Sequence, residues 1–253
     1  MEGIKRSIMI YNKIYNSRGK NKLFCLLIDP ENHTRRSLLR LVGEADQAHA
    51  DLILVGGSML SQGLDPTIQM IKENTGIPVV LFPGSLMQVS PHADGILFLS
   101  LISGRNPDLL IGNHVLAASM LKNSNLEVIP TGYILVGAGR ESSSVEYISN
   151  TKPIPAGKTD LISATAMAGE LLGHRLIYLE SGSGAAQPIE TQTIREVKKH
   201  VSLPLVVGGG LQSPEQVHRL CQAGADVVVV GNALEDDPLK IREMTAVIRS
   251  PLQ

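Results

Sequence analysis

Eight short apolar runs, separated by stretches with helical periodicity, constrain the fold of this chain more than any other feature. Helical periodicity fills most of the gaps, for example at Ser37–Ala48, Pro107–Leu121, Lys158–Leu172 and Pro214–Ala223. Apolar strands that alternate with helices predict an α/β protein, and eight repeats predict a single (β/α)8 TIM barrel. The predicted strands are Leu23–Ile28, Leu52–Val55, Val79–Phe82, Ile96–Leu99, Glu127–Ile129, Leu176–Leu179, Leu205–Val207 and Val227–Val230.

An open, doubly wound sheet is the alternative, but its glycine-rich first turn is missing because strand 1 ends in Asp29-Pro30. The 253 residues fit one barrel domain over 1–253. Residues 1–22 are polar and basic, so they are expected to form a leading helix rather than a secretory signal. Tyr133–Gly157 is rich in Gly, Ser and Pro and too long for an ordinary connection, and a mobile lid is one interpretation.

The balance of charge argues against a sequence-independent grip on nucleic acid, because 23 basic and 24 acidic residues give a net charge of −1. Cys25 and Cys221 lie far apart and form neither a metal-ligand spacing nor a disulfide framework, so a cytoplasmic location is expected. No apolar run approaches the roughly 18 residues of a membrane-spanning helix. Peripheral contact with a membrane surface stays open.

Three glycine turns follow the last three predicted strands. They are Tyr178-Leu179-Glu180-Ser181-Gly182-Ser183-Gly184-Ala185, Val207-Gly208-Gly209-Gly210 and Val230-Gly231-Asn232. Glycine lets a ligand approach the main chain, so that backbone N–H groups point at an anion. Loops after strands 7 and 8 are the habitual phosphate site of such barrels. The sequence therefore predicts one phosphate site at strands 6, 7 and 8, although tight turns alone would also explain each glycine.

Two carboxylates are expected at the mouth of the barrel. Asp29 ends strand 1, and Ser58 follows the neighbouring Val55-Gly56-Gly57 turn, a sparse ligand set that suits Mg²⁺ with substrate phosphate oxygens. Capping of a helix at Asp29-Pro30-Glu31 is the alternative role. A carboxylate such as Glu180 beside phosphate-binding glycines is unfavourable unless it orients or deprotonates a hydroxyl on the same ligand.

The sequence lacks the residues that a Schiff-base aldolase or a zinc enzyme would need. A Schiff-base aldolase needs a lysine at a strand end, and no predicted strand ends in one. The seven histidines form no HExxH motif or close ligand pair, which argues against a zinc site. His33, His92 and His114 are expected near the mouth, where they cap or pack.

These turns, together with further motifs, resemble the geranylgeranylglyceryl phosphate synthase family, which also includes bacterial heptaprenylglyceryl phosphate synthases. The resemblance covers nearly the whole chain, and the ordered set of motifs is specific. The further motifs are Leu27-Ile28-Asp29-Pro30, Val55-Gly56-Gly57-Ser58, Asn106-Pro107, Ile111-Gly112-Asn113-His114, Ile129-Pro130-Thr131-Gly132-Tyr133-Ile134 and Pro153-Ile154-Pro155-Ala156.

The resemblance implies a prenyltransferase of phospholipid biosynthesis, a phosphoglycerol geranylgeranyltransferase that is a homo-oligomer. The 3-hydroxyl of sn-glycerol 1-phosphate would attack C1 of a polyprenyl diphosphate, with geranylgeranyl favoured over a thirty-five-carbon chain. Asp29 and Ser58 match the family's Mg²⁺ positions, and Glu180 matches its catalytic carboxylate. The implied substrate-binding residues are Tyr178, Leu179, Glu180, Ser181, Gly182, Ser183, Gly184, Gly209, Gly210, Gly231 and Asn232.

Asn32 departs from the family pattern, because many relatives carry a lysine there, and Lys22 or Arg105 is expected to replace its charge. Two other functions remain open. A phosphosugar isomerase of the histidine or tryptophan pathway type would need a second acid at the end of strand 5, which is predicted to end at Ile129-Pro130-Thr131. A non-catalytic sensor of a phosphate ligand would need neither Asp29 nor Glu180.

Overall fold

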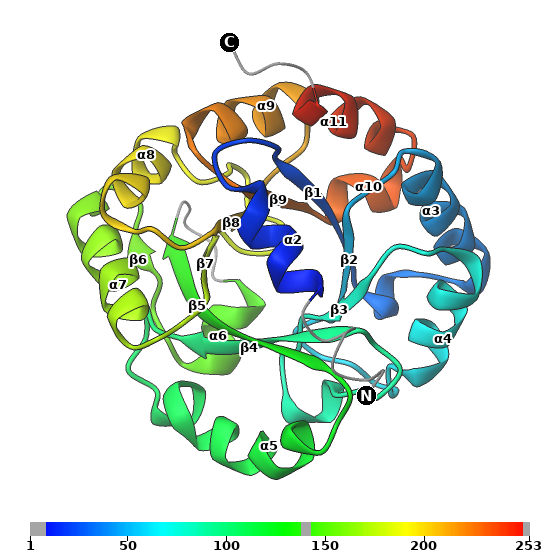
Figure 1. Ribbon diagram of the computed structural model, residues 1–253, viewed down its shortest axis with the longest axis horizontal. Coiled ribbons are helices and arrows are strands. Elements are labelled where there is room, and N and C mark those ends of the chain that lie inside the picture. Colours follow the sequence, from blue (N-terminus) through cyan, green and yellow to red (C-terminus); the bar gives the residue numbers. More distant parts are fainter. Residues whose placement is uncertain (1–8, 138–142, 250–253) are drawn as a thin grey trace.

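The computed structural model describes residues 9–137 and 143–249, which form a closed parallel barrel inside a ring of helices (Figure 1). Each barrel strand pairs in parallel with the next, and β9 pairs with β1 to close the sheet, which rules out the doubly wound alternative. The barrel strands are β1 (Leu23–Ile28), β2 (Leu52–Val55), β3 (Val79–Leu81), β4 (Gly95–Leu101), β5 (Glu127–Gly137), β7 (Leu176–Glu180), β8 (Leu205–Gly208) and β9 (Val227–Val230).

Helices connect the strands and cover the outside of the barrel (Figure 1). The long ones are α3 (Arg35–Gln47), α4 (Asp65–Asn74), α5 (Asn113–Lys122), α7 (Thr159–Leu171), α8 (Thr191–His200), α9 (Pro214–Ala223) and α11 (Lys240–Arg249). Short turns at the mouth are η1 (Pro30–Asn32), η2 (Leu86–Gln88), η3 (Asp108–Gly112), α6 (Ser144–Ser149) and α10 (Asn232–Asp236). The starts of α3 and α9 are set by side-chain caps, at Thr34 and at the Ser213–Gln216 capping box.

Alternation along the strands separates two apolar layers. In β7, Ile177 and Leu179 point outward and pack under the helices, whereas Leu176 and Tyr178 point into the barrel. The same two-residue period in the other strands fills the interior with side chains such as Leu54. Only the ends of the strands therefore remain available for a ligand.

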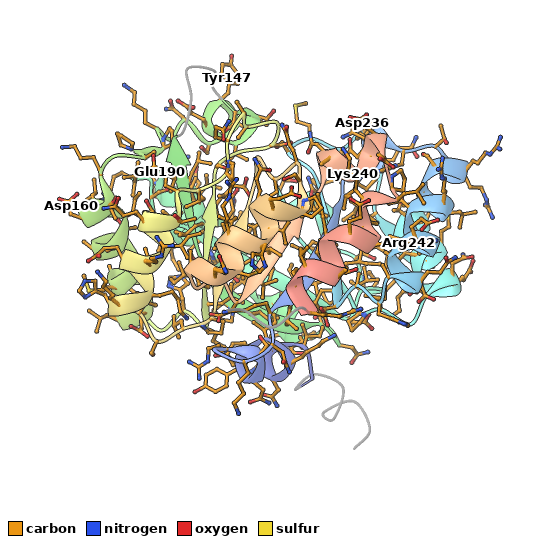
Figure 2. All side chains as sticks on the ribbon, turned by 90° about the horizontal axis from the view of Figure 1, so that it is seen from above. Tyr147, Asp160, Glu190, Asp236, Lys240 and Arg242 are labelled. Carbon is orange, nitrogen blue, oxygen red and sulfur yellow. The ribbon has the colours of Figure 1, made fainter. Side chains whose placement is uncertain are left out.

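Helix α2 (Met9–Ser17) lies across the lower end of the barrel, where the strands begin (Figures 1 and 2). Ile10 and Ile14 pack against interior residues of the barrel such as Cys25. The carboxylate of Glu127, at the start of β5, accepts hydrogen bonds from the backbone N–H groups of Ile10 and Tyr11, at 2.9 and 3.0 Å. These contacts confirm the leading helix over the residues that the structure describes.

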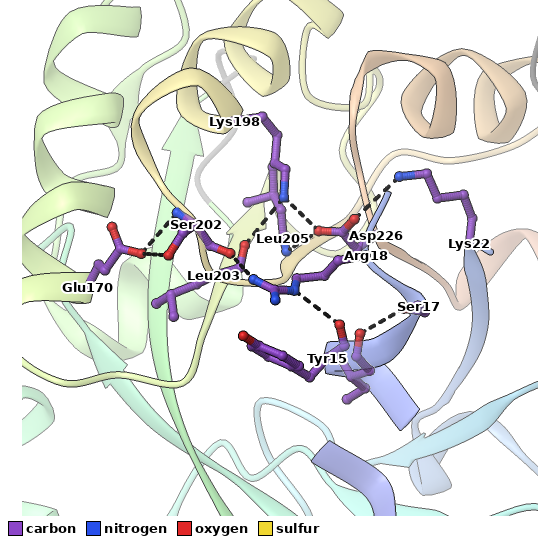
Figure 3. Close-up of polar contacts among 11 residues, drawn as sticks. Tyr15, Ser17, Arg18, Lys22, Glu170, Lys198, Ser202, Leu203, Leu205 and Asp226 are labelled. Carbon is purple, nitrogen blue, oxygen red and sulfur yellow. Dashed lines mark hydrogen bonds and ion pairs between the residues drawn. The ribbon is translucent and has the colours of Figure 1, made fainter. Parts of the chain in front are cut away.

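A buried carboxylate organises the lower end beside α2 (Figure 3). Asp226, which precedes β9 and is 1% exposed, accepts from the Leu205 N–H at 2.9 Å. Its oxygens also pair with Lys198 at 2.9 Å and with Lys22 at 3.3 Å. Two cations and one backbone donor therefore compensate the cost of burying this charge.

One expectation about the middle of the chain is wrong. Strand 5 does not end at Ile129-Pro130-Thr131 but continues to Gly137, and the carbonyl of Pro130 still accepts a hydrogen bond from Arg175 N–H. The predicted lid, Tyr133–Gly157, contains the upper half of β5, then α6, then β6 (Ile154–Pro155), which pairs with Val136 and Gly137. Residues 138–142 of that segment lie outside the described residues.

Among the helices that the structure describes, none combines the length and apolar character needed to cross a membrane.

Candidate active site

A cavity of about 920 Å³ opens at the upper end of the barrel, where the strands end. Its volume is that of a site for a substantial ligand. Ten of the predicted site residues line it, from five different strand ends and their turns. They are Asp29, Ser58, Tyr178, Glu180, Ser183, Gly184, Gly209, Gly210, Gly231 and Asn232.

The three glycine turns meet at this cavity, as predicted. Ser183, in the turn after β7, donates to the side-chain oxygen of Asn232, at the start of α10, at 3.3 Å. Gly209, after β8, has a positive φ of 84°, and a Cβ there would collide with the carboxylate of Glu180. Only glycine combines this backbone angle with so close an approach. The turns thus form one continuous surface of backbone groups.

Glu180 ends β7 and points into the cavity with only 5% of its surface exposed. One carboxylate oxygen accepts a hydrogen bond from the backbone N–H of Gly182 at 2.7 Å. Burial raises the pKa of this carboxyl from 4.5 to about 7, against the opposing effect of the Gly182 N–H. A carboxyl with a pKa near neutrality is suited to accept a proton from a substrate hydroxyl.

An aromatic cluster forms the cavity floor beneath Glu180. Tyr178 stacks on Phe82 and tilts against Tyr133, each with ring centroids 5.3 Å apart. The Tyr178 hydroxyl is fully buried beside the carboxylate of Glu180, and its interaction with that carboxylate opposes the rise in the pKa of Glu180. Burial, together with the charge of Glu180, keeps the pKa of this phenol well above its usual value. Tyr178 therefore stays protonated, with its hydroxyl beside the carboxylate of Glu180.

Asp29 and Ser58 line the cavity on the opposite side, at the ends of β1 and β2. Asp29 caps η1, because its Oδ1 accepts from the Glu31 N–H at 3.1 Å, so the alternative role is present as well. A Cβ on Gly57 would lie 2.6 Å from the other oxygen, Oδ2, so glycine leaves room for this carboxylate. Burial raises the pKa of Asp29, and a nearby cation would relieve that cost.

Three residues of the predicted cradle do not line the cavity. Leu179 is fully buried in the outer layer, because it alternates with Tyr178 along β7, and the structure does not bring its side chain to the site. Ser181 is turned toward β8, where its Oγ donates to the Gly208 carbonyl at 3.3 Å. Gly182 acts through its N–H, which holds Glu180.

The side of the cavity between η2, β4 and α5 is apolar, and the sequence did not single it out. Its lining residues include Leu86, Val89, Ile96, Phe98, Ala117 and Leu121. A signal exists in the sequence, because Ile111–Leu121 is apolar on more than one helix face and carries no charged residue.

Of the three histidines expected near the mouth, His114 lines the cavity, whereas His33 and His92 do not. His114 lines the apolar side, where its Nε2 lies 3.0 Å from Ser100 Oγ and its ring packs edge-on against Phe98. Burial lowers the pKa of His114, so the ring is neutral. His33 is half-buried beside η1, and His92 is exposed, 3.0 Å from Gln69 Nε2.

Neither cation expected to replace the missing lysine lies in the cavity. Lys22 pairs with Asp226 at the opposite end of the barrel, and Arg105 donates to the carbonyl of Gly104 at 2.6 Å. Asn32 itself donates to Glu235 at 3.1 Å. Lys240, at the start of α11, lines the cavity instead. The predicted site residues were taken from strand ends, and they did not include Lys240 because it lies beyond α10.

The fold and the mouth define a TIM-barrel enzyme whose candidate active site is built around three glycine turns at strand ends. A family model described as the PcrB family matches residues 15–248, and the chain belongs to this family. Two relatives named geranylgeranylglyceryl phosphate synthase come from Chitinophaga pinensis, 47% identical over 95% of this chain and 98% of its own, and from Pyrococcus furiosus, 42% identical over 88% of each. A solved structure from Thermoplasma acidophilum, of (S)-3-O-geranylgeranylglyceryl phosphate synthase in complex with sn-glycerol-1-phosphate, superposes with a TM-score of 0.90 at 31% identity over 95% of this chain and 98% of that one.

Proposed function

We propose that this protein is a prenyltransferase that joins the 3-hydroxyl of sn-glycerol 1-phosphate to C1 of geranylgeranyl diphosphate. One observation carries the proposal: the same cavity holds the glycine turns, the buried carboxyl of Glu180 and an apolar side between η2, β4 and α5. A phosphate with a reacting hydroxyl and a long apolar chain fit these three parts. The relatives named as synthases of geranylgeranylglyceryl phosphate support the same reaction.

The glycerol phosphate lies on the turns of Ser183, Gly209 and Asn232, with its free hydroxyl toward Glu180. Glu180 takes the hydroxyl proton while the oxygen forms a bond to C1 of the donor. The bond from C1 to the diphosphate oxygen breaks, and its electron pair leaves with the diphosphate. Alignment of the two ligands in one buried site lowers the entropic part of the barrier.

Mg²⁺ is the proposed cofactor, with Asp29 and Ser58 as the residues that would hold it. One half-buried carboxylate that lines the cavity fits a hard cation that draws its remaining ligands from water and phosphate. The ion would supply positive charge to the departing diphosphate. We expect Asp29→Ala to abolish Mg²⁺-dependent turnover while sn-glycerol 1-phosphate still binds in calorimetry, and equal loss of both would contradict separate subsites.

The donor chain lies on the apolar side of the cavity, beside Phe98, Ala117 and Leu121. Each buried methylene contributes up to about 0.8 kcal/mol, so the length of this surface selects the donor. We favour the twenty-carbon chain because the relatives are named for geranylgeranyl transfer.

The reaction is tested by incubating the protein with Mg²⁺, sn-glycerol 1-phosphate and donors of fifteen, twenty and thirty-five carbons. The expected product is the ether formed from the twenty-carbon donor, and sn-glycerol 3-phosphate serves as the enantiomer control. Absence of ether with every donor would overturn the proposal. Retained phosphate binding without turnover would then favour the sensor, because the described part of β5 beyond Thr131 offers no second acid for an isomerase.

We also propose a homo-oligomer in the cytoplasm. Cys25 and Cys221 are buried free thiols, which suits a reducing compartment. The surface of η3 and α5 leaves Ile111, Val115, Leu116 and Met120 exposed. An apolar helix face of this kind needs a cover. Because Ile111–Leu121 carries no lysine or arginine to attract anionic lipid, a second copy of this chain is the cover we favour over a membrane surface.

A further inference from the structure

The charged side chains that line the cavity are strongly unbalanced for a site that takes anions. Asp29, Asp108, Glu180, Glu235 and Asp236 line it, and among the described residues Lys240 is the single lysine or arginine that does. The two proposed substrates add phosphate and diphosphate charges to this acidic surface. Backbone N–H groups and one divalent cation offset only part of that repulsion. A lysine at this position therefore has a large electrostatic role.

Lys240 is placed to meet a ligand rather than a protein carboxylate. It is half-buried at the first position of α11, and no ion pair or hydrogen bond of its ammonium group is found among the described residues. Five other lysines do pair with carboxylates: Lys13, Lys22, Lys72, Lys198 and Lys199. In the side view, Lys240 and Asp236 lie toward the end of the molecule opposite α2 (Figure 2).

Lys240 lies on the side of the barrel mouth that carries Asp29 rather than on the side that carries Glu180. Helix α11 packs against α9, α3 and β1, and the last two flank the turn that carries Asp29. Glu235, on α10 just before α11, accepts a hydrogen bond from Asn32 at 3.1 Å and so joins this part of the rim to η1. The glycerol hydroxyl is assigned to Glu180 at the end of β7, across the barrel mouth.

We infer that the ammonium group of Lys240 binds the diphosphate of the prenyl donor, beside Asp29. The inference rests on the proposed function and names a further binding residue for that site. A charge-assisted hydrogen bond from ammonium to diphosphate oxygen is among the strong polar contacts in proteins. It would hold the leaving group and offset its growing charge as the bond to C1 breaks.

The test is the steady-state kinetics of Lys240→Gln, which shortens the side chain by one atom and keeps its helix propensity but removes the charge. We expect the KM for geranylgeranyl diphosphate to rise roughly ten- to a hundredfold, as for loss of a hydrogen bond to a charged group. The KM for sn-glycerol 1-phosphate should change less than about twofold, and Lys240→Arg should restore most of the donor affinity. The same charge change at the exposed Lys199, paired with Glu196 on α8, is the matched control.

An unchanged donor KM in Lys240→Gln would overturn the inference, as would a rise confined to the KM for sn-glycerol 1-phosphate. Arg105→Gln tests the rival cation, and a larger donor effect there than at Lys240 would also contradict it. Calorimetric titration of inorganic diphosphate with Mg²⁺ into each variant measures this contact without turnover. If the wild-type protein binds diphosphate through Lys240 but forms no ether, the proposed function fails while the contact between Lys240 and diphosphate stands.

Discussion

Glu180 carries a carboxyl group that is shielded from water, and this position sets the pH response of the site. Its pKa of about 7 in the folded protein lies above the ordinary value of 4.5 because burial disfavours the charged form. The folded state therefore holds a proton between these values that the unfolded state has released. The stabilising contribution of this group is complete below about pH 4.5 and is lost as the pH rises through about 7.

We predict opposite effects of Glu180→Gln on activity and stability. Because the amide cannot accept the hydroxyl proton, kcat should fall by roughly 10²- to 10⁴-fold. Because the amide carries no buried charge, the variant should unfold at a higher temperature than the wild type at pH 8 and at a similar temperature at pH 5. Calorimetric melting curves at both pH values measure this.

The wild-type enzyme should show the same group in its pH–rate profile. The value of kcat/KM should rise with pH and level off above about pH 7, since only the ionised carboxylate accepts the proton. A profile that stays flat between about pH 5.5 and 8 would remove Glu180 from the role of base.

At the scale of elements, the strand that begins at Val227 depends on the ion cluster of Asp226 below it (Figure 3). We predict that Asp226→Asn lowers the free energy of unfolding by about 3–5 kcal/mol, because it leaves the charges of Lys22 and Lys198 without their partner. The amide can still accept from the Leu205 N–H, so the loss reports the charge. Urea denaturation measures it.

Glu196→Gln on α8 is the control for Asp226→Asn, because Glu196 pairs with Lys199 and His200 at the surface. Solvent screens such pairs, and the urea midpoint of this variant should stay close to that of the wild type. Equal destabilisation by the two substitutions would mean that the buried cluster contributes no more to the free energy of unfolding than a surface ion pair does.

The sequence predicted elements where local signals agreed with the fold and failed where they conflicted. All eight barrel strands were found from their apolar runs, and Pro214–Ala223 was placed at its observed bounds by its cap. The upper half of β5 was missed because Pro130, a strand breaker in most contexts, interrupts the apolar run and is tolerated inside the barrel. The segment that was interpreted as a mobile lid also contains α6 and β6.

The site was predictable to the extent that strand ends define it. Asp29, Ser58 and Glu180 were found because the ends of parallel strands meet at one edge. Lys240 was not predicted, because its position in the cavity depends on how α10 returns the chain to the mouth of the barrel. Leu179 was included because a motif names consecutive residues, whereas a strand presents alternate ones to the cavity.

The whole molecule presents an apolar surface on η3 and α5 that a second copy would cover. We predict that Leu116→Lys, at a side chain that is 72% exposed, shifts the protein toward monomer without lowering its melting temperature. Sedimentation velocity over a range of concentrations measures the shift. A matched substitution, Leu172→Lys, lies at an exposed position after α7 and should leave the oligomer intact.

Two results would contradict this assignment of the surface. A wild-type protein that sediments as a monomer at every concentration would show that no second copy covers α5. Flotation of the wild type with anionic vesicles, lost in Leu116→Lys, would instead assign the surface to a membrane.

Helix α2 limits how substrates enter the enzyme and how the product leaves it. Because it closes the lower end of the barrel, the described residues leave the upper mouth as the route in and out. The ether product would carry both a glycerol phosphate head and a prenyl tail, so it would occupy the places of both substrates at once. The product must therefore leave by the upper mouth before either substrate can enter. Accumulated product would slow the enzyme by competing with both substrates.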